Sequence, residues 1–434
     1  MTDFDWGSMR GASVLIGGYG VAGRSAYRLA RELGAETVVF EDGANRPEEG
    51  VETISTLEEL SARLPFFDLV VVSPGIHPSH LLYSRREVVA SELALARRFL
   101  DVPIIAVTGT NGKTTVTTLV SRMLGRSGID NLAVGNIGEP ISAHVAAPPS
   151  VLVVEASSFQ LAYTDSLAPA QAAFLNFAPD HLDWHGTMEA YLAAKARIAE
   201  GMAEGAPIWV PAGEARISAA LSTSPGRQRG IFGPDAEVIG DKVRIGGLEV
   251  AAVSSLRRSL PHDLLNFCFA GAMAMEAGAD AASIGAVMEE FTGLAHRMEL
   301  IGEVEGHAVY NDSKATTPDA VLCDMQSIKS AVLIAGGRNK GVDLGPLASL
   351  APRLSAVVAM GEAAGEVVAV FAGTGTEVIQ AGGMDEAVAS AFALARGGDA
   401  VVLGPACTSW DNYTSYAARG EDFRRAVREW GRGH

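Results

Sequence analysis

Residues 104–120, IIAVTGTNGKTTVTTLV, are the most informative part of this chain. An apolar run at 104–107 is followed by a glycine-rich loop and then by a stretch of helical character. Backbone amides of such a loop surround phosphates, the Lys113 ammonium adds a positive charge, and the Thr114 hydroxyl is placed to reach Mg²⁺. Val107 stands where the common G-x-x-x-x-G-K-S/T motif has its first glycine, which disfavours an ordinary GTPase or motor. We therefore predict a phosphate-binding loop made of Gly109, Thr110, Asn111, Gly112, Lys113, Thr114 and Thr115.

Short apolar runs of the same kind recur along the chain and alternate with alanine-rich stretches of helical character. This alternation is typical of repeated strand–helix units, which form mainly parallel sheets. Most of the runs end in a Gly, Ser, Asn or acidic residue, and open α/β sheets bind ligands at the carboxyl ends of their strands. We expect an α/β protein whose buried strands include 12–16, 69–72, 104–107, 151–154, 172–175, 331–334, 356–360 and 400–403.

The length and two breaks in the pattern predict three domains. The 434 residues correspond to about three domains of roughly 150 residues. One break lies near 92–103, before a new strand, and the other near 292–295, between a helix-like run and a strand-like stretch. We predict domains at 1–92, 93–294 and 295–434, and the family resemblance described below implies that the first and third are Rossmann-like and that the central one is a P-loop ATPase domain. The central domain is expected to contain a hairpin at 243–250, and residues 1–10 to form a tail.

The composition excludes several classes of protein. Lys plus Arg number 34 against 51 Asp plus Glu, a formal net charge of −17, and such a surface repels nucleic acid. There is no uncharged apolar run of about 18 residues, the length needed to span a membrane, and the N-terminus lacks a signal pattern. The three cysteines are too widely spaced for a disulfide framework or a zinc cluster. We expect a soluble, cytoplasmic protein that neither binds nucleic acid nor inserts into a membrane.

A second glycine loop follows the first expected strand. Residues 12–23, ASVLIGGYGVAG, hold Gly18-x-Gly20-x-x-Gly23, and the acidic pair Glu41 and Asp42 follows. The spacing matches the dinucleotide-binding fingerprint, which offers backbone N–H groups and a helix N-terminus to a diphosphate. On these residues alone three interpretations stay open: NAD, another nucleotide diphosphate, or a tight turn without a ligand.

Together with the TGTNGKTT loop, four further segments resemble the Mur ligase family, ATP-dependent amide-forming enzymes of peptidoglycan synthesis. They are VVEASSFQL (153–161), NFAPDHLDWHG with YLAAKARI (176–198), HRMELIGEVEGHAVYNDSKATTPDA (296–320) and GPACTSWDNYTSYAARGEDF (404–423). The resemblance covers essentially the whole chain. NDSKAT at 311–316 is specific within the family, because ligases that add other amino acids differ at this place. It implies the reaction that adds D-glutamate to UDP-N-acetylmuramoyl-L-alanine through an acyl phosphate.

The resemblance implies roles for the polar residues at the strand ends. Lys113, His181 and Lys195 would be the catalytic residues, and a carbamylated Lys195 would join the ligands of one of two Mg²⁺ ions. ATP would also contact Asn266, Arg297 and Asp312. The metal ligands would be Thr114, Glu155, His181 and Lys195 as its carbamate. The UDP substrate and glutamate would bind Gly18, Gly20, Ser73, Asn136, Lys314, Thr316, Lys340, Ser409 and Tyr416.

Some residues depart from the family pattern, and other functions stay open. Asp263 replaces the usual Asn after His262, Thr317 replaces Asn, and Gly404 replaces Ser. The Glu41–Asp42 pair also differs from the usual Asp-Thr, so uracil contacts are not predicted. The alternatives are an L-glutamate-specific variant, another member of the superfamily, an NAD oxidoreductase opposed by the phosphate loop, and a nucleotide-binding regulatory protein. We expect a monomer.

Overall fold

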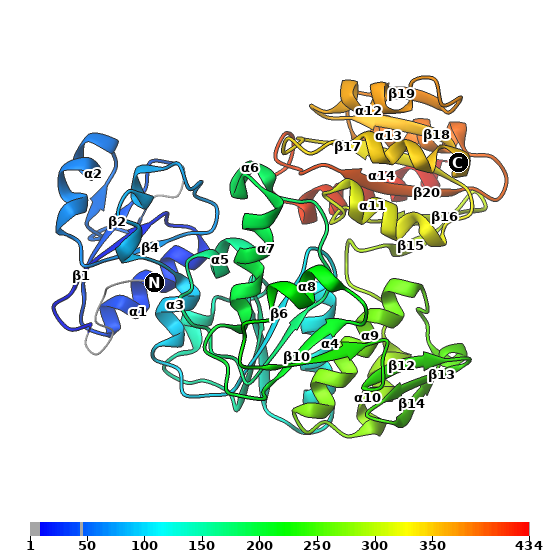
Figure 1. Ribbon diagram of the computed structural model, residues 1–434. Helices are drawn as coiled ribbons and strands as arrows, with labels where there is room; N and C mark the ends of the chain where they lie inside the picture. The colour runs from blue at the N-terminus through cyan, green and yellow to red at the C-terminus, as the bar shows by residue number, and fades with distance from the viewer. Residues whose placement is uncertain (1–8, 44–46, 434) are drawn as a thin grey trace. The chain divides into compact units, whose positions relative to one another are not determined.

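The computed structural model describes residues 9–43 and 47–433, so most of the predicted tail at 1–10 lies outside the described residues. Helices alternate with strands, and the described residues form three sheets, which fall at 13–91, 104–252 and 299–406 (Figure 1). Every expected strand is present, with ends that differ by a few residues at most. The predicted α/β class is confirmed.

The first sheet is parallel throughout and has the strand order β3-β2-β1-β4-β5. Successive residues of β1 point to opposite faces, so that Ile16 packs in one apolar cluster and Leu15 in another. Helices therefore cover both faces, as parallel sheets require. The elements are β1 (Ser13–Gly17), α1 (Val21–Glu32), β2 (Glu36–Phe40), β3 (Thr53–Ile54), α2 (Leu57–Arg63), β4 (Leu69–Val72), β5 (Val89–Ser91) and α3 (Glu92–Arg97).

The second sheet has the order β14-β13-β12-β11-β10-β9-β6-β8-β7. Its pairs are parallel except at one edge, where β12, β13 and β14 run antiparallel and contain the predicted hairpin. Its strands are β6 (Ile104–Thr108), β7 (Asn131–Gly135), β8 (Val151–Glu155), β9 (Gln171–Phe174), β10 (Pro207–Pro211), β11 (Arg227–Ile231), β12 (Ala236–Ile239), β13 (Lys242–Ile245) and β14 (Leu248–Ala252). Its helices are α4 (Lys113–Arg126), α5 (Ser158–Ala162), α6 (Leu182–His185), α7 (Met188–Ala196), α8 (Ala215–Ala220), α9 (Pro261–Glu276) and α10 (Ala281–Glu290).

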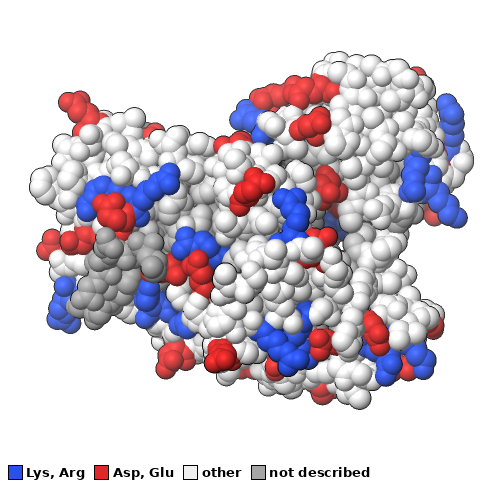
Figure 2. Space-filling view, in the orientation of Figure 1, with Lys and Arg blue, Asp and Glu red and all other residues white. Residues whose placement is uncertain are grey.

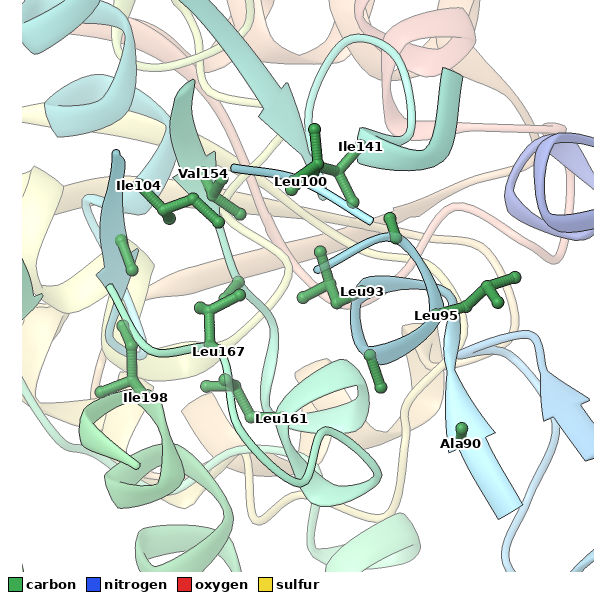
Figure 3. Close-up of a cluster of buried hydrophobic side chains, with 14 of the residues drawn as sticks. Ala90, Leu93, Leu95, Leu100, Ile104, Ile141, Val154, Leu161, Leu167 and Ile198 are labelled. Carbon is green, nitrogen blue, oxygen red and sulfur yellow. The ribbon is translucent and has the colours of Figure 1, made fainter. Parts of the chain in front are cut away.

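One apolar cluster joins the first two sheets through α3. Leu93 and Leu95 of this helix lie in the same cluster as Ile104 and Val154 of the second sheet and Ala90 of the first (Figure 3). Ile141, Leu161 and Ile198 extend the cluster (Figure 3). The Ser91 hydroxyl at the start of α3 adds a hydrogen bond to Thr164 Oγ1 at 2.7 Å. Because this core is continuous, the two sheets belong to one compact unit.

The third sheet has the order β15-β16-β20-β17-β18-β19 and is parallel apart from the β15–β16 pair. Leu333 and Ile334 of β17 belong to apolar clusters on opposite faces, one with α11 and α12 and the other with α13 and α14. The elements are β15 (Glu299–Val304), β16 (His307–Asn311), α11 (Pro318–Asp324), β17 (Ala331–Gly336), β18 (Leu354–Met360), α12 (Ala364–Phe371), β19 (Glu377–Ala381), α13 (Met384–Leu394), β20 (Ala400–Ala406) and α14 (Tyr416–Gly433).

The contacts divide the chain into two compact units. Unit 1 contains residues up to 177, 184–259 and 263–290, and unit 2 contains 178–183, 260–262 and the residues from 291 onward. The predicted domain boundaries at 92/93 and 294/295 stay predictions. No described helix is long and apolar enough to cross a membrane. On the face shown in Figure 2, acidic and basic side chains alternate in small groups without a continuous basic stripe.

Candidate active site

The predicted phosphate loop connects β6 to α4. Gly112 precedes the helix with a φ of 80°, and a Cβ there would lie 2.7 Å from the Asn266 amide oxygen. The loop is fixed by Asn176, whose side chain accepts from the Asn111 N–H at 2.8 Å and donates to the Asn111 carbonyl at 3.0 Å. The backbone thus has the strand–loop–helix form that exposes N–H groups to an anion. Of the predicted nucleotide residues, Asn266 is brought directly to this loop.

Glu155 ends β8, whose register places it opposite Val107, one residue before the end of β6. The side chain is 2% exposed. Asn136 donates from Nδ2 to Glu155 Oε1 at 2.7 Å, whereas Oε2 is buried and has no hydrogen-bond partner among the described residues. A buried carboxylate oxygen without a donor is costly unless a cation coordinates it. Oxygen ligands such as this one and the Thr114 hydroxyl match the preference of Mg²⁺.

Lys195 lies on α7 and is 1% exposed. Its Nζ donates to the Gly109 carbonyl at 2.7 Å and lies 4.8 Å from the centre of the Tyr191 ring. Lys113 Nζ donates to the same carbonyl at 2.9 Å and to that of Thr110 at 2.8 Å. Two ammonium groups therefore converge on one oxygen at the start of the loop. This concentration of donors and positive charge at the start of the loop suits the binding of an anion such as a phosphate.

His181 belongs to unit 2, whereas Thr114, Glu155 and Lys195 belong to unit 1. His181 has a φ of 53°, and its Nε2 lies 3.2 Å from Asp180 Oδ2. Asp180 also lies 3.4 Å from Lys340 Nζ, which joins the segment at 178–183 to the loop after β17. The predicted metal ligands are therefore divided between the two units.

The residues predicted to bind ATP are also divided between the two units. Arg297 and Asp312 belong to unit 2, where Asp312 is 2% exposed and accepts from the Met298 N–H at 3.0 Å. Burial and the neighbouring Asp324 carboxylate raise the pKa of Asp312 well above its usual range. In unit 1, Asp263, which replaces the usual family Asn, is buried and paired with Arg258 at 3.0 Å. The Arg258 guanidinium thus compensates the negative charge that Asp263 introduces in place of a neutral Asn.

The predicted amino-acid site consists of loops at the carboxyl ends of β16, β17 and β20. Lys314 follows β16, and its Nζ lies 3.8 Å from the centre of the Tyr416 ring at the start of α14. Ser409 follows β20, is 2% exposed and accepts from the Tyr413 N–H through its carbonyl. Thr316 and Lys340 lie in the loops after β16 and β17. The fold therefore brings all the predicted glutamate-binding residues to one edge of the third sheet.

The first glycine loop lines a cavity with a volume of about 520 Å³ at the end of β1, and Gly18, Gly20, Glu41 and Ser73 are part of its wall. Ser73 Oγ donates to the Gly18 carbonyl at 3.2 Å. Glu41 accepts the N–H groups of Tyr19 at 2.7 Å and Gly43 at 2.9 Å, so its carboxylate holds the loop itself. An NAD site uses an acidic residue at this position for the ribose hydroxyls, and here that residue is engaged by the backbone.

Two features were missed by the sequence analysis. Arg419 is buried beneath the loops of the third sheet, although a helical Arg normally suggests a solvated side chain. A further group that offers metal ligands is formed by His262, Cys323 and Asp324, whose ligand atoms lie within 4.8 Å of one another. Cys323 and Asp324 are adjacent in the sequence, but His262 is distant from them, so the sequence gave no sign of this group. Cys268 and Cys407 are free and buried, and burial raises the pKa of each thiol to about 12.

Comparison with known proteins identifies the class. Residues 107–228 match the Mur ligase middle domain and residues 296–407 match the Mur ligase glutamate ligase domain. A similar solved structure is the UDP-N-acetylmuramate-alanine ligase MurC from Thermotoga maritima, with a TM-score of 0.61 and 17% identity over 96% of this chain and 99% of that one. This identity is too low to show more than a common fold. The matched middle and glutamate ligase domains, however, show that the chain belongs to the Mur ligase family.

The curated relatives are more specific. The UDP-N-acetylmuramoylalanine–D-glutamate ligase of Frankia casuarinae is 39% identical, covering 97% of this chain and 95% of the relative. The enzyme of the same name from Pelotomaculum thermopropionicum is 37% identical over 95% of this chain and 97% of the relative. The predicted membership of the family and resemblance to its D-glutamate-adding ligases are confirmed.

Proposed function

We propose that this chain uses ATP to join D-glutamate to UDP-N-acetylmuramoyl-L-alanine, acting in the cytoplasm as a monomer. The observation that carries the proposal is Glu155, a buried carboxylate with one unpartnered oxygen beside the phosphate loop. The relatives that share most of the chain's length support the choice of substrates. A carboxylate does not react with an amine at neutral pH, so the reaction requires prior activation of the carboxyl group.

The reaction takes place in two steps. A carboxylate oxygen of the alanyl end attacks the γ-phosphorus of ATP, the bond to the bridging oxygen breaks, and ADP leaves. The amine of glutamate, after losing a proton, then attacks the acyl carbon, and inorganic phosphate leaves from the tetrahedral intermediate. Lys113 and the loop N–H groups stabilise the charge on the transferred phosphoryl group. Lys314, Lys340, Thr316, Ser409 and Tyr416 orient glutamate.

The donor set fits a magnesium ion. Thr114 and Glu155 would hold it, with His181 and a carbamylated Lys195 as further ligands of one or two ions. Mg²⁺ neutralises phosphate charge and orients the transferred group when bound. Carbamylation would replace the Lys195 ammonium, which cannot ligate a cation, by an anion that can.

The nucleotide-linked substrate is assigned to the first glycine loop. Gly18, Gly20 and Ser73 line the cavity at the end of β1, where the N-terminus of α1 favours a diphosphate. Asn136 is assigned to the muramoyl portion, and Asn266, Arg297 and Asp312 are assigned to ATP. An NAD oxidoreductase is the competing interpretation of this cavity, and direct titration with NADH tests it.

Phosphate release with ATP, Mg²⁺ and UDP-N-acetylmuramoyl-L-alanine tests the proposal, in reactions with D-glutamate, L-glutamate or no amino acid. We expect release that depends on D-glutamate, together with an amide product of the corresponding mass. Preference for L-glutamate would keep the mechanism and change the specificity, whereas no turnover with either would refute the proposal. Lys113→Ala should abolish release, because the phosphates lose their cation. Lys242→Ala is the matched control, since Lys242 is an exposed lysine paired with Glu249.

A further inference from the structure

Arg419 is a buried arginine in the first turn of α14 and is 2% exposed. Its Nε donates to Ser313 Oγ at 3.0 Å, and Nη2 donates to the Ser313 carbonyl at 2.9 Å and the Cys407 carbonyl at 3.1 Å. Nη1 donates to the carbonyls of Thr408 at 3.1 Å and Gly336 at 3.5 Å. A guanidinium has five N–H groups in a planar fork, and each has an acceptor here.

These acceptors belong to the loops that carry the predicted glutamate-binding residues. Ser313 directly precedes Lys314, Gly336 ends the strand that leads to Lys340, and Thr408 directly precedes Ser409. The fourth segment is the start of α14 itself, because Ser313 Oγ donates to the Tyr416 carbonyl at 2.8 Å. A single side chain thus connects the ends of β16, β17 and β20 with the first turn of α14.

The surrounding backbone leaves room for this side chain. A Cβ on Gly337 would lie 2.9 Å from Arg419 Nη1 and 2.2 Å from the Thr408 carbonyl. Two further bonds fasten the same loops, since the Arg338 N–H donates to the Thr408 carbonyl at 2.9 Å and the Thr408 N–H donates to the Arg338 carbonyl at 3.0 Å. The loops after β17 and β20 are therefore held side by side with the guanidinium beneath them.

The charge of Arg419 is not balanced by an ion pair. All of its acceptors are neutral oxygens, and in the described part of the chain no carboxylate lies within the 4.0 Å limit of a salt bridge. Burial lowers the pKa of its guanidinium to about 10, so the group stays charged at neutral pH. The Asp411 carboxylate acts on the guanidinium from beyond ion-pair distance and offsets part of its charge, and the remaining positive field favours anions at the adjacent surface.

We propose that Arg419 is the positioning residue of the amino-acid site. It fixes the loops that carry Lys314, Lys340 and Ser409 relative to one another, and this arrangement makes the site selective for a dicarboxylate. This inference rests on the proposed function, which supplies the roles of these three residues. Lysine cannot replace Arg419, because an ammonium has three donors and no planar fork. The positioning role therefore predicts a defect even in the variant that keeps the charge.

The test uses the full-length protein and the variants Arg419→Lys and Arg419→Gln. We expect the KM for D-glutamate to rise by about tenfold or more in Arg419→Lys, because bonds to a charged group are lost where the substrate carboxylates bind. The KM values for ATP and for the UDP substrate should stay within about twofold of the wild type, because a substitution has little effect on residues with which it shares no partners. Arg428→Lys is the control, since Arg428 lies on the same helix and is exposed.

Three results obtained with Arg419→Lys would overturn the proposal. They are an unchanged KM for D-glutamate in Arg419→Lys, an equal rise in the KM of all substrates, and a failure of Arg419→Lys to fold, which would make the role structural only. Thermal stabilisation by D-glutamate and by glutarate, a dicarboxylate without the amine, separates this inference from the proposed function. If the wild type releases no phosphate but glutarate stabilises it and not Arg419→Lys, the proposed reaction fails and the positioning role stands. If neither dicarboxylate stabilises the wild type, the positioning role fails as well.

Discussion

Gly23→Ala tests how tightly the first glycine loop is packed. Gly23 lies in the first turn of α1, and a Cβ there would meet the Gly18 carbonyl oxygen at 1.9 Å. Contacts of a real Cβ below 3.0 Å are essentially never seen, so the oxygen and the helix must separate by about 1.1 Å, the difference between these distances. The movement also strains the bond from Ser73 Oγ to the same oxygen, at 3.2 Å.

Two opposing effects set the magnitude. Overpacking against backbone costs up to about 3 kcal/mol, whereas alanine improves helix propensity over glycine by about 1 kcal/mol. A backbone carbonyl cannot move aside as a side chain can, so the upper end of the overpacking cost applies and the net loss is up to about 2 kcal/mol; at about 2 to 4 °C per kcal/mol for a large unit, the melting temperature falls by up to about 4 to 8 °C. Gly20→Ala is the control, because a Cβ at Gly20 has no atom within 4 Å and its φ is −71°.

Scanning calorimetry measures the stability of both variants, and the KM for the UDP substrate measures their function. Gly23→Ala should melt about 4 to 8 °C below the wild type, whereas Gly20→Ala, which only replaces a favoured N-cap residue of α1, should lower the melting temperature by about 1 to 3 °C. Gly20→Ala should nevertheless raise the KM, because its methyl group occupies the cavity assigned to the diphosphate. Equal melting temperatures for Gly23→Ala and the wild type would refute the packing argument.

Two further predictions concern buried carboxyl groups. In Glu155→Gln, the Mg²⁺ concentration for half-maximal phosphate release should rise by about tenfold or more, because the anionic ligand is lost. An unchanged Mg²⁺ titration would show that Glu155 does not belong to the cation site. With the wild type, EDTA should abolish phosphate release until Mg²⁺ is restored. Burial raises the pKa of Glu92, so its contribution to stability is complete below the pKa of the unfolded chain and is lost as the pH rises through the folded pKa. Glu92→Gln has no such titration, so its melting temperature relative to the wild type should increase from about pH 4 to about pH 8, and a constant difference would contradict this assignment.

Much of the fold could be predicted because its buried strands are local apolar runs. The eight expected strands are all present, and so is the Gly-Gly hairpin. Strands such as β11, RQRGI, and β19, EVIQA, were not predicted, because polar residues interrupt them and their side chains are only partly buried. Their positions depend on pairing with β10 and β18, which is tertiary information that a single sequence does not display.

The residues of the candidate site could likewise be predicted from the sequence only in part. Lys113 and Glu155 could be found because a glycine loop or an acidic strand end marks them in the sequence. Arg419 could not be found, because RGEDFRR resembles any solvated helical segment. Only the fold shows that the loops at the ends of three strands bury its side chain. The pairing of Asp263 with Arg258 was also hidden, although it explains how a carboxylate is accommodated where an amide is usual. Local motifs thus show where chemistry takes place, whereas the residues that hold those motifs become visible only in the fold.

The net charge of −17 has to be reconciled with substrates that are all anions. At physiological ionic strength, charges are screened over about 8 Å, so most of the acidic surface has little effect inside a loop. Lys113 donates to the Gly109 carbonyl within the phosphate loop, and Arg419 lies beneath the loop that carries Lys314. Lys113 acts on a bound phosphate at short range, where screening by water and salt is weak, whereas Arg419 acts from beneath its loop without touching the ligand. An acidic exterior therefore discourages extended polyanions, while the loop cations still favour small phosphates and carboxylates.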